Sequence, residues 1–275
     1  MLHNDKFINH KGAVIHYVVA GLGSPVILVH GFCEDHSVWL KWAAPLAEHR
    51  KLILPDLPGF GRSQLPGSSM QMSDYAEAVR AVAEAEGVAS APFLGHSMGG
   101  YTVLQLAQQH PERVNGLGLF HSSALEDDEQ KKTDRQRVAD FVRQNGKEPF
   151  VAELIPKLFS KTYLEKHKEK VREWTARCTE FSTAEGIIAA SLAMRARNDT
   201  TQVLRQARYP VLFIIGKEDL AVLPERVLPQ THLPDCAVIE LLDHVAHMGM
   251  MEAPEPCLKA VQQWLSLCDL KNQVG

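Results

Sequence analysis

The serine at position 97 has the sequence surroundings of a nucleophile. It lies in the stretch GHSMGG, residues 95–100, between an apolar run at residues 91–94 and a helical pattern that follows. In the pattern G-x-S-x-G, a serine at a sharp turn from strand to helix has a strained backbone, for which the flanking glycines make room. The turn holds the hydroxyl clear of the sheet at the positive end of a helix, where it can attack a carbonyl carbon.

A serine is a weak nucleophile at neutral pH, so it needs a neighbouring base, and the base needs an acidic residue that orients it. In a parallel sheet these partners should follow later strands, because the carboxyl ends of the strands share one edge with Ser97. The apolar run 211–215 is followed by GKED, residues 216–219. The run that ends near Leu242 is followed by DHVAHMG, residues 243–249. The predicted order is therefore serine, acid, histidine.

Each of these two loops offers more than one candidate. A carboxylate one residue earlier would point in a different direction from the strand end, so Asp219 is preferred over Glu218 as the acid. Glu218 is expected to be a solvated surface residue. His244 and His247 both lie in the right loop, and the residues alone leave the choice between them open.

The elements that must position these residues alternate between strands and helices. Short apolar runs predict strands at 14–20, 26–29, 52–54, 91–94, 114–120, 211–215 and 237–242. Helical patterns lie at 38–48, after Ser73 as N-cap up to Gly87, after the serine, and from about 254 to 267. Short strands alternating with helices predict an α/β fold, with a mostly parallel sheet covered by helices on both faces.

The alternation stops between about Ser123 and Leu204. That segment shows no strand pattern, only helical patterns with many charged residues, and Pro156 must end or kink one of its helices. Residues 182–185 have the form of a capping box for a later helix. Because strands resume afterwards, the sequence predicts a core of residues 1–122 and 205–275, into which an all-helical domain, residues 123–204, is inserted.

Composition limits the classes of function. The 275 residues are 45% hydrophobic and 23% charged, with a net charge of -4, which gives no electrostatic case for nucleic acid or an anionic membrane. No apolar run approaches the length that spans a bilayer, and the N-terminus has no signal pattern. The 5 cysteines show neither metal spacing nor a disulfide framework. We expect a cytoplasmic protein with no metal and no cofactor.

The chain resembles the α/β-hydrolase fold family over nearly its whole length. The motifs that carry the resemblance are the oxyanion loop His30-Gly31-Phe32, the loop 56–63, the nucleophile elbow 95–100, the acid loop 216–219 and the histidine loop 247–254. Such motifs in the right order are more specific than any one alone. The resemblance implies an eight-stranded, mostly parallel sheet, with residues 123–204 as the cap. The cap is similar to those of the small esterase, enol-lactonase and cofactor-free haloperoxidase branch.

The resemblance also implies the role of each site residue. Ser97 is the nucleophile and Asp219 the acid, while the spacing to residues 252–254 favours His247 over His244 as the base. The oxyanion donors are the backbone N–H groups of Phe32 and Met98. Residues predicted to line the substrate pocket are His30, Gly31, Cys33, His96, His121 and Ser122.

Three residues near these motifs are expected to have structural roles. His30 should hold the loop of Phe32 in shape through hydrogen bonds to nearby backbone, in addition to its place beside the pocket. Asp56 and Arg62 should form a structural pair or other loop contacts.

The expected function is that of a serine hydrolase, which cleaves small to medium carboxylic esters through an acyl-enzyme. Family members with the same triad also cleave carbon–carbon bonds of ring-fission products, open lactones or form peracids. Carbon–carbon hydrolases of the family often carry Asn in place of His96, and Ser97 excludes the chemistry of dehalogenases and epoxide hydrolases. A receptor for a small molecule, with residual hydrolase activity, is the alternative from another class. A monomer or homodimer that takes an ester-like small molecule is expected.

Overall fold

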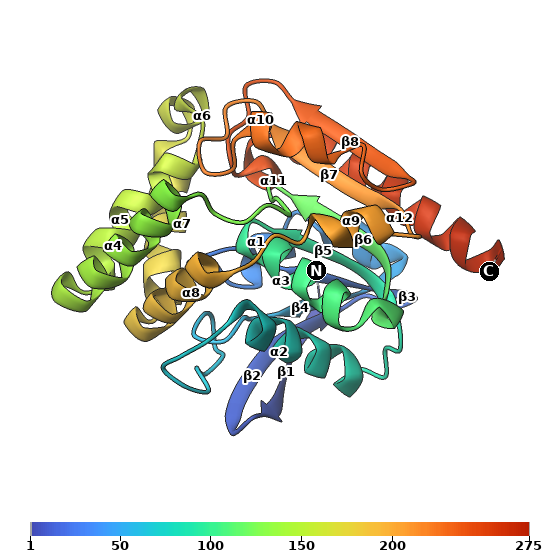
Figure 1. Cartoon of the computed structure of the whole chain (residues 1–275), viewed down its shortest axis with the longest axis horizontal. Coiled ribbons are helices and arrows are strands. Elements are labelled where there is room, and N and C mark those ends of the chain that lie inside the picture. Colours follow the sequence, from blue (N-terminus) through green and yellow to red (C-terminus); the bar gives the residue numbers. More distant parts are fainter. Residues whose placement is uncertain (1, 275) are drawn as a thin grey trace.

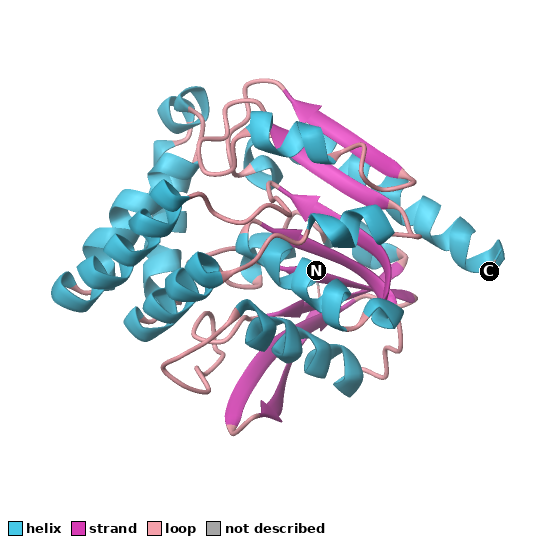
Figure 2. Ribbon diagram, viewed as in Figure 1, coloured by secondary structure: helices cyan, strands magenta, loops and turns pink. Residues whose placement is uncertain are grey.

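The fold is built on one sheet of eight strands. The computed structural model describes residues 2–274, of which 272–274 are described by their backbone alone. The strands follow the order β1-β2-β4-β3-β5-β6-β7-β8 across the sheet. The pairs β1–β2 and β2–β4 are antiparallel, and all other pairs are parallel. The predicted fold class is confirmed, and helices cover both faces of the sheet (Figures 1 and 2).

The strands in the middle of the sheet are buried on both faces, which explains their continuous apolar runs. The bounds are β1 His3–His10, β2 Ala13–Ala20, β3 Ser24–Val29, β4 Arg50–Pro55, β5 Ala91–His96, β6 Val114–Phe120, β7 Val211–Gly216 and β8 Ala237–Leu242. The edge strand β1 was not predicted. It is mostly exposed and polar, so it lacks the apolar pattern by which the other strands are found.

Helices α1 Ser37–Leu40, α2 Met72–Ala85, α3 Met98–Gln109, α9 Thr201–Gln206, α10 Pro224–Val227, α11 Gly249–Glu252 and α12 Pro254–Val274 accompany the sheet. The helix predicted over 38–48 is instead a short α1 followed by a 3-10 turn at Ala44–Glu48. Pro45 has no backbone N–H to continue the helix, so the element is split. No helix in the part of the chain described here is long and apolar enough to cross a membrane.

The segment predicted as the cap, residues 123–204, contains α4 Glu129–Asn145, α5 Lys147–Leu154, α6 Lys161–Lys166, α7 Lys168–Glu180 and α8 Ala184–Ala196. These helices lie together beyond one end of the strands, in yellow-green to gold in Figure 1, whereas α9 lies with the helices of the sheet. Pro156 ends α5 and begins a 3-10 turn, as predicted. The division of the chain into two domains stays a prediction.

Two helices begin one or two residues away from the predicted caps. Gln71, and not Ser73, precedes α2, and its N–H donates to the Asp74 carboxylate at 2.9 Å. Thr183, and not Ser182, caps α8 by accepting the N–H of Gly186 at 2.9 Å. In both cases a neighbouring polar residue fulfils the same requirement, the pairing of a free N–H group at the helix start.

Candidate active site

Ser97 occupies a strained turn between β5 and α3. Its backbone angles are φ 50° and ψ -114°, in a region that non-glycine residues rarely adopt. A Cβ atom on Gly95 would lie 2.2 Å from the Gly99 carbonyl oxygen, and one on Gly99 would lie 2.3 Å from that of Val29. The turn therefore requires glycine at both positions, and the backbone strain lies at Ser97.

Asp219 follows β7 and accepts hydrogen bonds on both carboxylate oxygens. Oδ1 accepts the N–H groups of Ala221 and Val222, both at 2.8 Å. Oδ2 lies 2.8 Å from Nδ1 of His247 and 3.2 Å from Nδ1 of His121. Burial acts to raise the pKa of Asp219, but the charge of His247 and the hydrogen bonds of both histidines outweigh it and hold the pKa well below its usual range. The carboxylate therefore stays ionised.

His247 follows β8 and is 3% exposed. Because Nδ1 faces Asp219, Nε2 is the ring nitrogen left for Ser97. The backbone N–H of His247 donates to the carbonyl of Leu158 in the cap at 2.9 Å. The Glu252 carboxylate accepts the N–H groups of the residues on either side, Ala246 and Met248, each at 3.2 Å. The loop that carries His247 is thus held by hydrogen bonds from both sides, through Glu252 and through Leu158.

Ser97 and His247 line the same small cavity, of about 60 Å³. Its other lining residues are Phe32, Glu34, His96, Tyr101, Arg135, Leu154, Leu158, Met194, Ala221 and Val222. The cap supplies Arg135, Leu154, Leu158 and Met194, which no local sequence pattern singled out, because only the folded cap brings them over Ser97.

Of the two predicted oxyanion donors, one lines this cavity and the other directly follows Ser97 in the chain. Phe32 lines the cavity, and Met98 is the first residue of α3. The first N–H groups of a helix have no partner within the helix, so that of Met98 is available to an oxyanion. His30 joins the Phe32 loop to the next one, since its Nδ1 lies 2.8 Å from the Gly31 carbonyl and its Nε2 accepts the N–H of Leu57 at 2.9 Å.

Of the residues predicted to line the pocket, His96 does so, and the others lie outside the lining of this cavity. His30, Cys33, His121 and Ser122 are all buried behind it. Ser122 Oγ donates to the backbone carbonyl of Ser97 at 2.8 Å and so helps to hold the turn in place. Burial raises the pKa of the Cys33 thiol, which therefore stays protonated. Gly31 also lies outside the lining, and its N–H is bound by the Glu34 carboxylate.

His121 has a role that sequence reasoning missed. Its Nε2 accepts the N–H of Gly249 at 3.2 Å, so the proton of the neutral ring is on Nδ1, which donates to Asp219. Burial lowers the pKa of His121 to about 4, against the influence of Asp219. The residue is therefore a neutral donor that joins the acid loop to the histidine loop. Its position at the end of β6, beside β7, was the available signal.

The rival candidates lie outside the site. The side chains of Glu218 and His244 are 42% and 85% exposed, and they face each other at 3.3 Å. In the part of the chain that the structure describes, neither side chain forms a hydrogen bond with Asp219 or His247.

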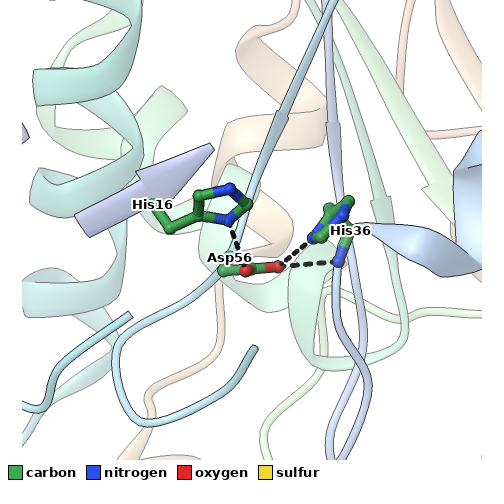
Figure 3. Close-up of side chains that lie close together, drawn as sticks. All are labelled: His16, His36 and Asp56. Carbon is green, nitrogen blue, oxygen red and sulfur yellow. Dashed lines mark hydrogen bonds and ion pairs between the residues drawn. The ribbon is translucent and has the colours of Figure 1, made fainter. Parts of the chain in front are cut away.

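A second buried cluster joins His16, His36 and Asp56 (Figure 3). Asp56 Oδ2 lies 2.7 Å from His16 Nδ1, and Oδ1 lies 2.8 Å from His36 Nδ1. The backbone N–H groups of His36 and Arg62 also donate to this carboxylate, at 2.8 and 2.9 Å. Arg62 therefore contacts Asp56 through its backbone, while its side chain binds Asp5.

These residue types can hold a metal ion, and so can the group His121, Asp219 and His247. In both groups, however, the histidine nitrogens lie 2.7 to 3.2 Å from the carboxylate, which is hydrogen-bond distance, and backbone N–H groups occupy its other lone pairs. A metal-free site stays a prediction.

Known proteins resemble this chain over most of its length. A family model for the alpha/beta hydrolase fold matches residues 24–254. The chain is 32% identical over 246 residues to the dihydrolipoyllysine-residue acetyltransferase component of the acetoin cleaving system of Pseudomonas putida, over 85% of this chain. It spans 61% of the length of that relative.

Two further similarities cover nearly the whole chain. A 2-hydroxy-6-oxo-6-(2'-aminophenyl)hexa-2,4-dienoic acid hydrolase of Metapseudomonas resinovorans is 26% identical over an alignment 275 residues long, which covers 95% of this chain and 91% of that protein. The solved structure of a thermophilic esterase from Thermogutta terrifontis has a TM-score of 0.90 and 28% identity, and the match covers 96% of this chain and 99% of that one.

Proposed function

The chain belongs to the α/β-hydrolase family, and from that premise we propose that it is a serine hydrolase of small to medium carboxylic esters. The hydrogen bond of 2.8 Å between His247 Nδ1 and Asp219 carries the proposal, because it orients the ring that shares a cavity with Ser97. The likeness to an esterase at 28% identity adds support.

The reaction would follow two steps of acyl transfer. Ser97 Oγ attacks the ester carbonyl while His247 Nε2 takes its proton, and Asp219 stabilises the imidazolium that forms. His247 then gives the proton to the leaving alcohol. Water hydrolyses the acyl-enzyme with His247 again as base. The N–H groups of Phe32 and Met98 would stabilise the oxyanion in both steps. Each N–H group would raise kcat by a factor on the order of 10²–10³.

The cavity favours a short acyl group. Its volume is about 60 Å³, and Leu154, Leu158, Met194 and Val222 make much of its wall apolar. A long or branched acyl chain would need the cap to move.

A second candidate function is hydrolysis of a carbon–carbon bond in a dienoate ring-fission product. It is favoured by the 26% identity to a dienoic acid hydrolase along nearly the whole chain. The same triad would serve both reactions, so the activity must be measured on both kinds of substrate.

A panel of p-nitrophenyl esters of rising acyl length, assayed beside a dienoate ring-fission product, tests the proposal. We expect sustained turnover that is fastest for the shortest esters, and loss of roughly 10⁶ in kcat for Ser97→Ala. Fast cleavage of the dienoate with weak, flat ester activity would favour the second candidate. A burst of a single turnover without steady-state hydrolysis would indicate a receptor instead.

A further inference from the structure

Glu34 is a buried carboxylate beside the catalytic cavity that the reaction described above does not use. The residue is 2% exposed and lines the cavity together with Ser97 and His247. Its Oε2 accepts the N–H of Gly31 at 2.7 Å and lies 2.9 Å from Nδ1 of His96. Its Oε1 has no hydrogen-bond partner among the residues that the structure describes. A carboxylate so far from water is costly unless a charged partner compensates it.

His96 is that partner. Its Nε2 lies 3.0 Å from the backbone carbonyl of His247, and since a carbonyl oxygen only accepts, Nε2 must carry a hydrogen. A hydrogen on Nδ1 as well, donated to Glu34, makes the ring an imidazolium. Burial acts to lower the pKa of His96, but the charge of Glu34 and its hydrogen bond raise it above the usual value. Burial likewise acts to raise the pKa of Glu34, but the charge and the hydrogen bond of His96 outweigh burial, so the pKa lies below its usual value.

We propose that Glu34 and His96 form a buried ion pair that positions the oxyanion loop and the catalytic histidine on either side of Ser97. The expected effect of the pair on turnover rests on the proposed function. The pair makes three connections. First, Glu34 accepts the N–H of Gly31, the residue before the proposed oxyanion donor Phe32. Second, His96 directly precedes Ser97 in the chain, and third, its Nε2 donates to the carbonyl of His247.

Aromatic rings surround the buried His96. The ring centroid lies 4.9 Å from that of His247 and 6.2 Å from that of His121, while Trp39 and Phe120 enclose it at 6.3 and 6.0 Å. His121 is neutral, and the charge of Asp219 also favours the imidazolium. Glu34 is the carboxylate in hydrogen-bond contact with the ring.

The substitution Glu34→Gln removes the charge and little else. Both hydrogen bonds go to Oε2, so the amide oxygen can still accept the N–H of Gly31, and it accepts from His96 when the ring hydrogen is on Nδ1; the NH₂ group takes the place of the unpaired Oε1. The neutral His96 can then no longer donate from both nitrogens. Because small displacements of catalytic groups cost about 10²-fold, we expect kcat to fall roughly 10- to 100-fold, with KM changed less than about 3-fold.

The matched control is Glu77→Gln. Glu77 pairs with His110 at 2.6 Å, the same two residue types, but both side chains are partly exposed and neither lines the catalytic cavity. This variant should keep the kcat and KM of the original protein. An equal loss of kcat in both variants would contradict the proposal, as would an unchanged kcat in Glu34→Gln.

The protonation of His96 is measured directly by ¹⁵N NMR of its ring, which needs no substrate. We expect both nitrogens to keep their hydrogens to a higher pH in the original protein than in Glu34→Gln, because Glu34 raises the pKa of His96. A neutral His96 in the original protein would overturn the ion pair whatever the enzyme cleaves. A charged His96 in a protein without ester turnover would instead refute only the proposed function.

A second variant keeps the test decisive if Glu34→Gln fails to fold. The amide of His96→Asn can still donate to Glu34 but is too short to reach the carbonyl of His247. We expect a loss of kcat similar to that of Glu34→Gln, and a slower reaction of Ser97 with a fluorophosphonate. The original rate of labelling in a folded His96→Asn would overturn the positioning role.

Discussion

At the scale of single residues, the site depends on which carboxylates are buried and what donates to them. Asp219 is almost wholly buried and receives hydrogen bonds from His121, His247 and two backbone N–H groups. Its neighbour Glu218 points to solvent, although the two differ by one position in the chain. Sequence reasoning anticipated this difference, because consecutive residues after a strand point in different directions.

Asp219→Asn should therefore lower kcat by about 10⁴, since the amide no longer holds His247 in the tautomer that accepts a proton from Ser97. Glu218→Gln is the control and should leave kcat unchanged, because its side chain faces only His244 and solvent. Steady-state kinetics on a short p-nitrophenyl ester measure both. A reversed ranking of the two variants would contradict the choice of acid.

His121 predicts how stability depends on pH. Its pKa is lowered by burial to about 4 in the folded protein, whereas the unfolded chain binds a proton near the ordinary 6.5. Between these values the unfolded state holds more protons, so stability must fall as the pH falls. From pH 7 to pH 4.5 this one residue should account for a loss of about 2–3 kcal/mol in the free energy of unfolding.

Urea unfolding at both pH values checks this expectation. His121→Asn should show a smaller loss on acidification than the original protein. His244→Asn removes an exposed histidine and should leave the pH dependence as it is. An unaltered slope in His121→Asn would show that other groups, such as the buried His30, govern the effect.

At the scale of elements, the strands and the elbow could be predicted because local physics determines them. The central strands are apolar because both of their faces are covered; these strands are β3, β5, β6 and β7. The glycines of the elbow are required because a Cβ atom there would collide with neighbouring backbone. The strand β1 could not be predicted, because pairing with β2 holds it and its side chains are exposed.

The pocket was predicted less well for a similar reason. Sequence reasoning assumed that residues next to the motifs would face the substrate, but His121 and Ser122 instead point beneath the elbow and the acid loop. The residues that do line the cavity include Arg135 and Met194 from the cap. Only tertiary packing brings these segments together, so no local pattern contains the information.

Gly99→Ala tests the tight packing of the elbow against β3. The added Cβ would lie 2.3 Å from the carbonyl oxygen of Val29, and backbone has to move to make room. We expect a loss of about 1–3 kcal/mol in the free energy of unfolding, together with reduced kcat. In Gly67→Ala the new methyl group meets nothing within 4 Å, so stability and activity should stay the same. Urea unfolding and ester turnover measure both variants.

At the scale of the whole molecule, the helical segment predicted as the cap meets the rest of the chain at His247. The N–H of His247 donates to Leu158 in the cap, and the carboxylate of Glu252 accepts the N–H of Ser160 in the cap as well as N–H groups of the histidine loop. The cap therefore helps to hold the base in place while it shapes the cavity.

Glu252→Ala should weaken this junction. Ser160, Ala246 and Met248 would lose their acceptor at once, so we expect kcat to fall for every ester in the panel by roughly the same factor, on the order of 10-fold. Glu255→Ala, an exposed neighbour, is the control. A change in acyl-length preference without a common loss of kcat would mean that Glu252 acts on the shape of the cavity alone.

The hydrogen bond from His247 to Leu158 has a consequence for protein engineering. A chimaera that receives a foreign cap from a relative must also receive a carbonyl group at this place, or the base loses one of its supports even if the new cap folds correctly. A change of cap thus alters both substrate range and reactivity. Loop grafts that preserve the backbone of residues 158–160 should therefore keep a higher kcat than exchanges of the whole cap.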